Sequence, residues 1–312
     1  CALPIFEKRD WSDVLLEKCG LTRANMPELV EGCDISATLD PVVAQRWGLT
    51  PSVVVAGGGG DNAVSAIGVG AVSPGDAFIS LGTSGVLFVV TDAYRPAPQS
   101  AVHAFCHVLP NLWHQMSVML SAASCLQWFC RLVGTTETEL LEEIAQLSDA
   151  EKASAPMFLP YLSGERTPHN DPDARGMFWG LTHSSQRALM GYAVLEGVSF
   201  GIADGLRVLQ ESGTNIEQCS LVGGGARSPF WAQLLADILD MPVVTHKGGE
   251  TGGALGAARL ACLAAGKPLA SVCEKPEVYK TWYGDPVRHT ALMQRYQQFN
   301  ALYRNDLNYR NQ

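Results

Sequence analysis

Residues 220–239 read SLVGGGARSPFWAQLLADIL: a short apolar run, three glycines and an amphipathic segment. This order predicts a strand, a glycine turn and a helix, with Ser228 as the N-cap and Pro229 in the first helical turn. Residues 51–72, PSVVVAGGGGDNAVSAIGVGAV, repeat the order, with a short buried strand over 53–56 and a helix opened by Asp61. Alternation of strand, turn and helix predicts an α/β protein.

Other stretches extend this pattern. Residues 76–92, DAFISLGTSGVLFVVTD, place two β-rich runs around Gly82–Gly85, which predicts a hairpin. A regular apolar stripe predicts a long helix over 187–210. Shorter helices are expected within 11–30, within the Gly/Ala-rich stretch 248–266, and over 117–133 with Met119, Leu126 and Leu132 on the buried side. Residues 158–176, FLPYLSGERTPHNDPDARG, form a long loop, and such loops are usually functional or mobile.

Composition limits the partners of the chain. Its 312 residues suggest two domains, and 47% apolar residues are enough for a buried core. The net charge of −9 argues against nucleic acid as a partner, because an acidic surface repels phosphate backbones and no basic patch offsets it. No uninterrupted apolar run is long enough to span a bilayer, so no membrane partner is expected.

The cysteines and histidines do not suggest a metal site. The nine cysteines include no C-x-x-C pair and lie in apolar stretches, which favours free thiols in a reducing cytosol. His103 and His107 could share a metal only on one helix, which Pro110 and the β-branched neighbours disfavour. We therefore expect structural roles for His103, His107 and His114.

Three glycine-rich turns, 57–60, 82–85 and 223–225, are candidates for binding phosphate. Glycine lets backbone N–H groups approach a phosphate closely, and a helix N-terminus adds a positive dipole. Each turn alone is also ordinary punctuation between strands. The P-loop and dinucleotide-binding fingerprints are absent, so a nucleotide would be bound by another architecture.

Three side chains have both a chemical and a structural interpretation, and a fourth has a structural one. Asp61 could accept a proton from a substrate hydroxyl, or it could cap its helix. Thr83 could hold a phosphate with its hydroxyl, or the turn could be only a hairpin. Arg166 could grip a phosphate or tie down its own loop. Glu196 stands mid-helix among apolar residues, and a buried acid must be paired or hydrogen-bonded.

Taken together, these stretches resemble the FGGY family of carbohydrate kinases. The matching segments, in chain order, are AGGGGDNAVSAIGVG, SLGTSGVLFV, FLPYLSGERTPHNDPDARG, GMFWGL with AVLEG, and GGGARSPFWAQLLADIL. The resemblance runs from about Trp11 to about Ala265 and is nearest to bacterial xylulose kinases. It implies two domains of the actin-like, ribonuclease-H-like ATPase fold, with sugar and MgATP meeting in the cleft between them.

The resemblance also implies roles for residues of this chain. Asp61 matches the catalytic base, and Asp61 and Asn62 match positions that approach the sugar. The positions that match the ATP site are Gly82, Thr83, Ser84, Ala123, Gln127, Gly224, Gly225 and Ala226. Glu196 closes the second signature segment of the family, in which Leu189 replaces a usually polar residue. The implied reaction transfers the ATP γ-phosphoryl group to O5 of D-xylulose with ATP and Mg²⁺ as cofactors, and no metal ligand is assigned.

The N-terminal D-x-G-T turn of the family has no counterpart here. We therefore expect residues 1–72 to be the tail of the first, sugar-side domain and residues 73–312 to be the complete second, nucleotide-side domain. This chain alone is expected to be inactive, and the full-length protein to be a cytoplasmic pentulose kinase. The alternatives are a kinase for ribulose, fuculose, gluconate or glycerol, a non-catalytic nucleotide-binding module, and a chaperone-type or actin-like ATPase. The oligomeric state is left open, a homodimer being one alternative.

Overall fold

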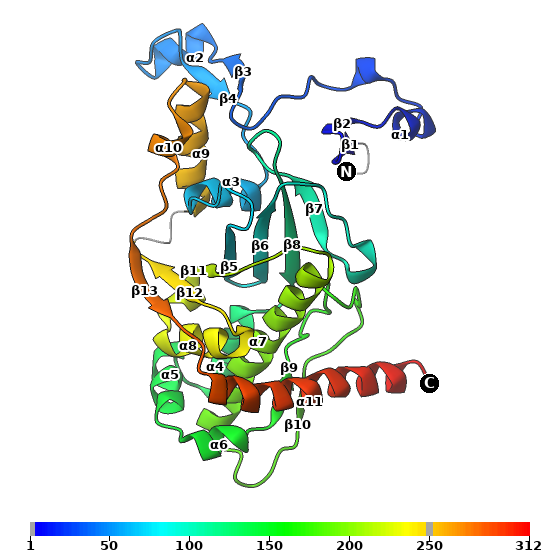
Figure 1. Cartoon of the computed structure of the whole chain (residues 1–312), viewed down its shortest axis with the longest axis vertical. Coiled ribbons are helices and arrows are strands. Elements are labelled where there is room, and N and C mark those ends of the chain that lie inside the picture. Colours follow the sequence, from blue (N-terminus) through cyan, green and yellow to red (C-terminus); the bar gives the residue numbers. More distant parts are fainter. Residues whose placement is uncertain (1–3, 248–251) are drawn as a thin grey trace.

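A seven-stranded mixed sheet lies at the centre of the computed structural model, which describes residues 4–247 and 252–312 (Figure 1). Its strand order is β13-β12-β11-β5-β6-β8-β7. Strand β11 pairs in parallel with β5 and β12, and the other neighbours are antiparallel. The strands are β5 (Ala77–Leu81), β6 (Gly85–Thr91), β7 (His103–Cys106), β8 (Trp113–Met119), β11 (Cys219–Val222), β12 (Val243–His246) and β13 (Val278–Trp282).

Successive residues of each central strand face different apolar cores. On β5, Ile79 belongs to the large core and Phe78 to a smaller core on the opposite face, as the strand period of two requires. Helices α4, α7, α8 and α11 contribute to the large core, and α3 to the smaller one. The helices of this part are α3 (Asp61–Gly68), α4 (Ala123–Val133), α5 (Glu137–Ala145), α6 (Asp149–Ala153), α7 (Arg187–Glu211), α8 (Pro229–Leu239), α9 (Gly252–Ala264), α10 (Leu269–Val272) and α11 (Pro286–Arg310).

Several sequence predictions are confirmed. The hairpin around residues 82–85 joins β5 to β6, and the helix expected over 187–210 is α7. The Ser228 hydroxyl accepts a hydrogen bond from the Trp231 N–H and caps α8, which begins at Pro229. Among the described residues, α7 is the one helix that is long and apolar enough to cross a membrane. Its most apolar stretch is 89% buried inside the protein, as in the core helix of a folded domain.

The expected helix over 117–133 is wrong in its first part. Residues up to Met119 belong to β8, where they pair with β6 along the whole strand, and α4 begins only at Ala123. Met119 is buried as expected, but it belongs to strand β8 and not to a helix. Leu132 is 64% exposed, because α4 turns that residue away from the core. Pairing with β6 thus overrides the local helical pattern.

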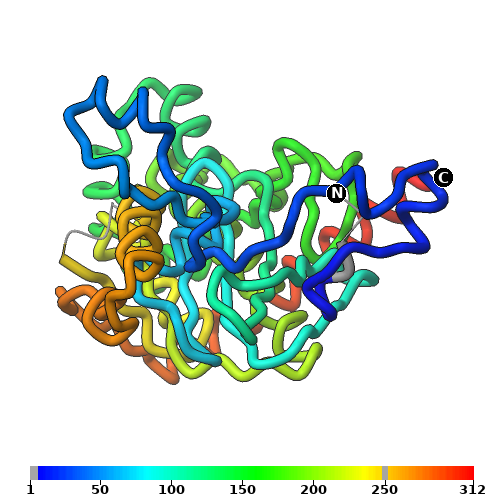
Figure 2. The backbone as a smooth tube through the Cα atoms, turned by 90° about the horizontal axis from the view of Figure 1, so that it is seen from above, coloured from blue at the N-terminus to red at the C-terminus, as the bar shows by residue number. Residues whose placement is uncertain are grey.

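The N-terminal part differs most from expectation, and Figure 2 shows it as long blue loops along the outside of the molecule. The helix expected within 11–30 is confined to 13–18, followed by a short 3-10 turn and extended chain. The strand predicted at 53–56 exists, but Val55 in it is 41% exposed, because this strand pairs only with β3 among the described residues. The elements are β1 (Pro4–Ile5), β2 (Asp10–Trp11), α1 (Asp13–Lys18), β3 (Ile35–Thr38), α2 (Pro41–Arg46) and β4 (Val54–Ala56).

The Gly/Ala-rich helix packs closely on another helix, as its small residues predict. A Cβ added at Gly256 of α9 would overlap the Val64 carbonyl of α3. Residues 248–251 of the predicted helix lie outside the described residues. The loop 158–176 is framed by the antiparallel strands β9 (Met157–Leu159) and β10 (Met177–Trp179).

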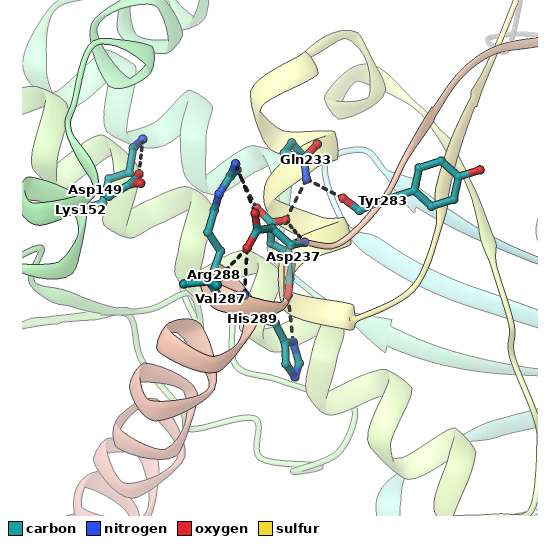
Figure 3. A network of polar contacts seen from close by, with 9 residues as sticks. Asp149, Lys152, Gln233, Asp237, Tyr283, Val287, Arg288 and His289 are labelled. Atoms are coloured by element: carbon teal, nitrogen blue, oxygen red, sulfur yellow. Dashed lines mark hydrogen bonds and ion pairs between the residues drawn. The ribbon is translucent and has the colours of Figure 1, made fainter.

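The C-terminal helix α11 is fastened to α8 by a polar network (Figure 3). The buried Asp237 carboxylate of α8 accepts hydrogen bonds from the Gln233 amide and the Asp285 N–H, and it pairs with Arg288. The Asp237 carbonyl oxygen lies 3.0 Å from His289 Nδ1. These contacts fix the start of α11 against the end of α8.

Candidate functional site

Two of the predicted glycine turns lie side by side at one edge of the sheet. Parallel strands β5 and β11 pair Val222 with Ser80, so their carboxyl ends meet there. A Cβ added at Gly225 would overlap the Leu81 side chain, and one at Gly223 would lie 2.9 Å from the Leu81 carbonyl oxygen. Gly223 also has φ +86°, which favours glycine. In open α/β sheets, ligands commonly bind at the carboxyl ends of such strands.

The start of α4 fixes the turn 82–84. The N–H groups of Ala122 and Ala123 donate to the carbonyls of Thr83 and Gly82 at 2.9 and 2.8 Å. The Ser124 hydroxyl adds a 2.8 Å bond to the Thr83 carbonyl. Within the described ranges, the N–H groups of Thr83 and Ser84 have no hydrogen-bond partner. The turn thus has its carbonyls engaged and these two donors available for a ligand.

A cavity of about 330 Å³ opens at this edge. It brings Asn62 together with Gly224, both predicted site residues, although they are far apart in the sequence. A Cβ at Gly224 would meet no atom within 4 Å, so there is open space above that residue. The lining residues are Asn62, Ser65, Val69, Phe78, Ser80, Val222, Gly223, Gly224, Arg227, Gly252 and Gly253.

Asp61 occupies the first helical position of α3, and the N-cap is Gly60. The capping interpretation is therefore wrong for this residue. Asp61 Oδ1 accepts hydrogen bonds from the Asn62 N–H at 2.7 Å and from the Asn62 amide at 3.2 Å. Its carboxylate is exposed, and no cation pairs with it among the described residues. The helix N-terminus stabilises this negative charge, which leaves an exposed carboxylate beside the cavity-lining Asn62.

Other predicted site residues stand nearby without lining the cavity. Ala123 begins α4 and bonds to the Gly82 carbonyl, whereas Gln127 is exposed one turn further along α4. Gly225 and Ala226 lie in the short 3-10 turn that precedes α8.

Sequence reasoning missed Ser65, Ser80 and Arg227, which line the cavity. Ser65 is four residues after Asp61, so helical periodicity places the two on one face. Ser80 lies opposite Val222 in the β5–β11 ladder, and this proximity needs the strand order, which the sequence does not reveal.

The structure confirms the prediction for Glu196 and contradicts the structural interpretation of Arg166. Glu196 is fully buried in α7, and Arg295 of α11 donates two hydrogen bonds to its carboxylate at 2.7 and 2.6 Å. The predicted pairing of this acid is confirmed, and its role is to join two helices. The Arg166 guanidinium makes no hydrogen bond or ion pair in the part of the chain that the structure describes, so the loop-tying interpretation of its side chain is wrong.

His107 and His114 pack as neutral aromatic side chains. Burial lowers the pKa of His107 to about 4 and that of His114 to about 3. The His114 ring stacks on Phe88 at 4.5 Å between centroids. His103 lies in β7, so it shares no helix with His107. Within residues 4–247 and 252–312, no cluster of three His, Cys, Asp or Glu side chains could hold a metal ion.

A second cavity, of about 460 Å³, lies between α6, α7, α8 and α11. None of the predicted site residues lines it. The polar groups at its rim pair with one another: Lys152 contacts Asp149 and the Phe230 ring, and Arg288 contacts Asp237 (Figure 3). The candidate site is therefore the first cavity.

Comparison with known proteins agrees with this architecture. Residues 77–265 match the C-terminal domain of the FGGY family of carbohydrate kinases, and residues 5–68 match the N-terminal domain of the same family. The chain belongs to the FGGY family of carbohydrate kinases. Its fold is the actin-like α/β ATPase fold of that family, as the resemblance implied.

Several relatives of the chain are xylulose kinases, and a gluconokinase of Bacillus subtilis is 28% identical to it. The chain is 49% identical to xylulose kinase of Escherichia coli K12 over 95% of its own length and 61% of that protein. It is 51% identical to xylulose kinase of Klebsiella pneumoniae over 82% of its own length and 53% of that protein. A crystal structure titled a xyloylose kinase from Brucella ovis superimposes with a TM-score of 0.91 at 48% identity, covering 96% of this chain and 62% of that one. The chain thus spans about three-fifths of the length of these relatives.

Replacing glycines of the turn 223–225 should separate folding from binding. Gly225→Ala should lower the free energy of unfolding by about 1–3 kcal/mol, because the new methyl group would overlap Leu81. Gly224→Ala is the matched control, because its methyl group enters open space. It should leave stability unchanged and weaken ligand binding in the cavity. Urea denaturation and ligand titration of both variants check this, and equal stabilities would contradict the packing argument.

Proposed function

We propose that this chain forms the nucleotide-binding part of a kinase that transfers the γ-phosphoryl group of ATP to D-xylulose, giving D-xylulose 5-phosphate. The observation that carries the proposal is the meeting of Asn62, next to Asp61, with Gly224 in one cavity at the ends of β5 and β11. Identities of 49% and 51% to two xylulose kinases support the choice of sugar. Turnover belongs to a protein of the relatives' full length, and we propose that this chain alone is inactive.

We assign the nucleotide to two turns and one helix start. The phosphates would bind at Gly82, Thr83 and Ser84, where two N–H groups have no partner among the described residues. The adenosine would bind at Gly224, Gly225 and Ala226, with Ala123 and Gln127 of α4 close to it. Backbone N–H groups held in place before the reaction stabilise developing phosphate charge without reorganisation.

Asp61 is the proposed catalytic base. Phosphoryl transfer has a loose transition state, so positioning and charge stabilisation do most of the work. Asp61 Oδ1 is held by Asn62, and its Oδ2 has no partner among the described residues. Oδ2 would orient the sugar hydroxyl and accept its proton late in the transfer, while Asn62 contacts the sugar.

Mg²⁺ would accompany the nucleotide. This ion usually keeps several water ligands and binds the phosphates of a substrate with one or two carboxylates. Because Asp61 is assigned to the sugar hydroxyl, no carboxylate of the described residues is assigned to the ion. When bound, the ion neutralises charge on the phosphates. In this chain, the N–H groups of the turn 82–84 would stabilise the negative charge of the phosphates.

We retain the proposed division at residues 72 and 73. The segment 1–72 then contributes Asp61, and its helix α3 packs on α9 of the segment 73–312.

The eight described cysteines are free thiols, which supports a reducing compartment and a cytoplasmic protein. A homodimer is the assembly that sedimentation should test first.

Titration calorimetry with MgADP on this 312-residue chain tests the nucleotide site directly. We expect weak binding and no sugar-dependent turnover. An absence of binding would contradict the assignment of the two turns. Turnover with D-xylulose would contradict the proposed inactivity of this chain. ATP hydrolysis that is stimulated by peptide and unaffected by sugar would favour the actin-like ATPase instead.

A further inference from the structure

Glu165, in the loop segment 163–168 (SGERTP), is a buried carboxylate with two backbone donors. It is 3% exposed, and its Oε1 accepts hydrogen bonds from the Leu120 N–H at 3.0 Å and the Arg166 N–H at 2.7 Å. Leu120 follows the last residue of β8. A single oxygen of Glu165 thus ties the SGERTP segment to the end of a central strand.

Thr167 forms a second attachment of this segment to β8, at Val118, two residues before Leu120. Its hydroxyl accepts from the Val118 N–H at 3.0 Å, and its own N–H donates to the Val118 carbonyl at 3.1 Å. On the other side, the backbone of Glu165 exchanges two 2.8 Å hydrogen bonds with Asp171. Asp171 is bound by Arg310 and Tyr303 of α11. The segment is therefore held between β8 and the C-terminal helix.

A short path leads from Glu165 to the phosphate turn. Leu120 is followed by Ser121, and then by Ala122 and Ala123, whose N–H groups bind the carbonyls of Thr83 and Gly82. Only the segment 120–123 separates the Glu165 carboxylate from these bonds. Residues 120–123 therefore connect the Glu165 carboxylate to the turn that we assign to the phosphates.

The second oxygen of Glu165 has no such partner. Oε2 is buried and makes no hydrogen bond among the described residues. Burial raises the pKa of Glu165 to about 7, and the charge of Asp204 on α7 adds to the effect, whereas Arg166 opposes it. Cys125 of α4 and Tyr161 are the other titratable groups that face it. Burial therefore favours the neutral form of this carboxyl, compared with an exposed glutamate.

We propose that Glu165 is a positioning residue for the phosphate turn 82–84: its Oε1 sets the end of β8, and through residues 120–123 it sets the N–H groups that meet the nucleotide. The inference rests on the proposed nucleotide site and goes beyond it, because Glu165 itself touches no substrate. A glutamine keeps the accepting oxygen and lacks the charge, so it reproduces the neutral carboxyl. An alanine leaves the Leu120 and Arg166 donors buried without a partner.

The test compares three variants of the 312-residue chain by MgADP titration and by amide hydrogen exchange. Glu165→Ala should bind MgADP about tenfold more weakly, because part of the binding energy would be used to restore the turn geometry that the two unpaired donors no longer hold. Glu165→Gln should stay within about threefold of the wild type. Asp173→Ala is the matched control, because Asp173 is an exposed acid of the same loop and pairs at the surface with Arg175.

Hydrogen exchange separates positioning from general loss of structure. In Glu165→Ala, the amides of Leu120, Ala122 and Ala123 should exchange faster, while those of α11 keep their protection. Equal affinity of Glu165→Ala and the wild type would overturn the proposal, and so would equal losses for the alanine and glutamine variants. If Glu165→Ala does not fold, the glutamine variant decides, since a loss of tenfold or more in it would overturn the proposal. If the wild type binds no MgADP, the nucleotide site fails, and the exchange of residues 120–123 still tests the attachment.

Discussion

Asp61→Ala, in a protein extended to the full length of its relatives, is expected to lower kcat with D-xylulose by about 10²–10⁴-fold. Asp61 would orient the reacting hydroxyl and accept its proton, and none of the described residues that line the cavity is a carboxylate that could replace it. KM for MgATP should change little, because the nucleotide would bind at the turns 82–84 and 224–226. A coupled assay of ADP release measures both parameters.

Two further variants sharpen this result. Asp61→Asn keeps the side-chain size and the bonds to Asn62, so a loss as large as that of alanine would assign the effect to the missing base. Glu28→Gln, at an exposed acid of the same N-terminal part, should leave kcat unchanged. Full turnover by Asp61→Ala would remove Asp61 from the base role without affecting the assignment of the nucleotide turns.

The largest expected effect on stability comes from the buried pair of Glu196 and Arg295. Glu196→Ala should reduce the free energy of unfolding by about 3–5 kcal/mol, because it leaves a buried guanidinium without its carboxylate. Arg295 also donates to the carbonyls of Ala153 and Ala155, so the pair joins α7, α11 and the segment before β9. Urea denaturation at constant pH measures the change.

The exposed pair of Arg187 and Glu143 is the matched control, since it also involves α7. Glu143→Ala should leave the unfolding midpoint close to that of the wild type, because solvent screens an exposed pair. The double replacement Glu196→Leu with Arg295→Met should recover much of the loss, as apolar replacements of buried pairs often do. Equal effects of Glu196→Ala and Glu143→Ala would contradict the role of burial.

The local sequence was enough to predict helices and turns that depend only on neighbouring residues. The cap of α8 at Ser228, the hairpin at 82–85 and the long helix α7 all follow from local turn residues and periodicity. The expected helix at 117–133 failed where pairing with β6 extends β8 to Met119. The helix expected within 11–30 is present but covers only the six residues 13–18.

The candidate site shows the same division. The local glycine pattern predicted the turns and Asp61 as candidates, and the family resemblance added Asn62. Ser65 follows from helical spacing, but Ser80 and Arg227 require the parallel pairing of β5 with β11, which is a long-range contact. The partner of Glu196 was equally beyond reach, because Arg295 lies 99 residues away on α11. Burial of Glu196 could be predicted from its own helix, whereas its partner could not.

The most direct test of the proposed function is the product formed by a protein extended to the full length of its relatives, incubated with MgATP and D-xylulose. Phosphorus NMR of the mixture identifies the phosphorylated atom and the nucleotide released. We predict D-xylulose 5-phosphate and ADP in equal amounts, with slower turnover of ribulose, gluconate and glycerol. Release of inorganic phosphate without a sugar phosphate, or faster turnover of another of these substrates, would contradict the assignment.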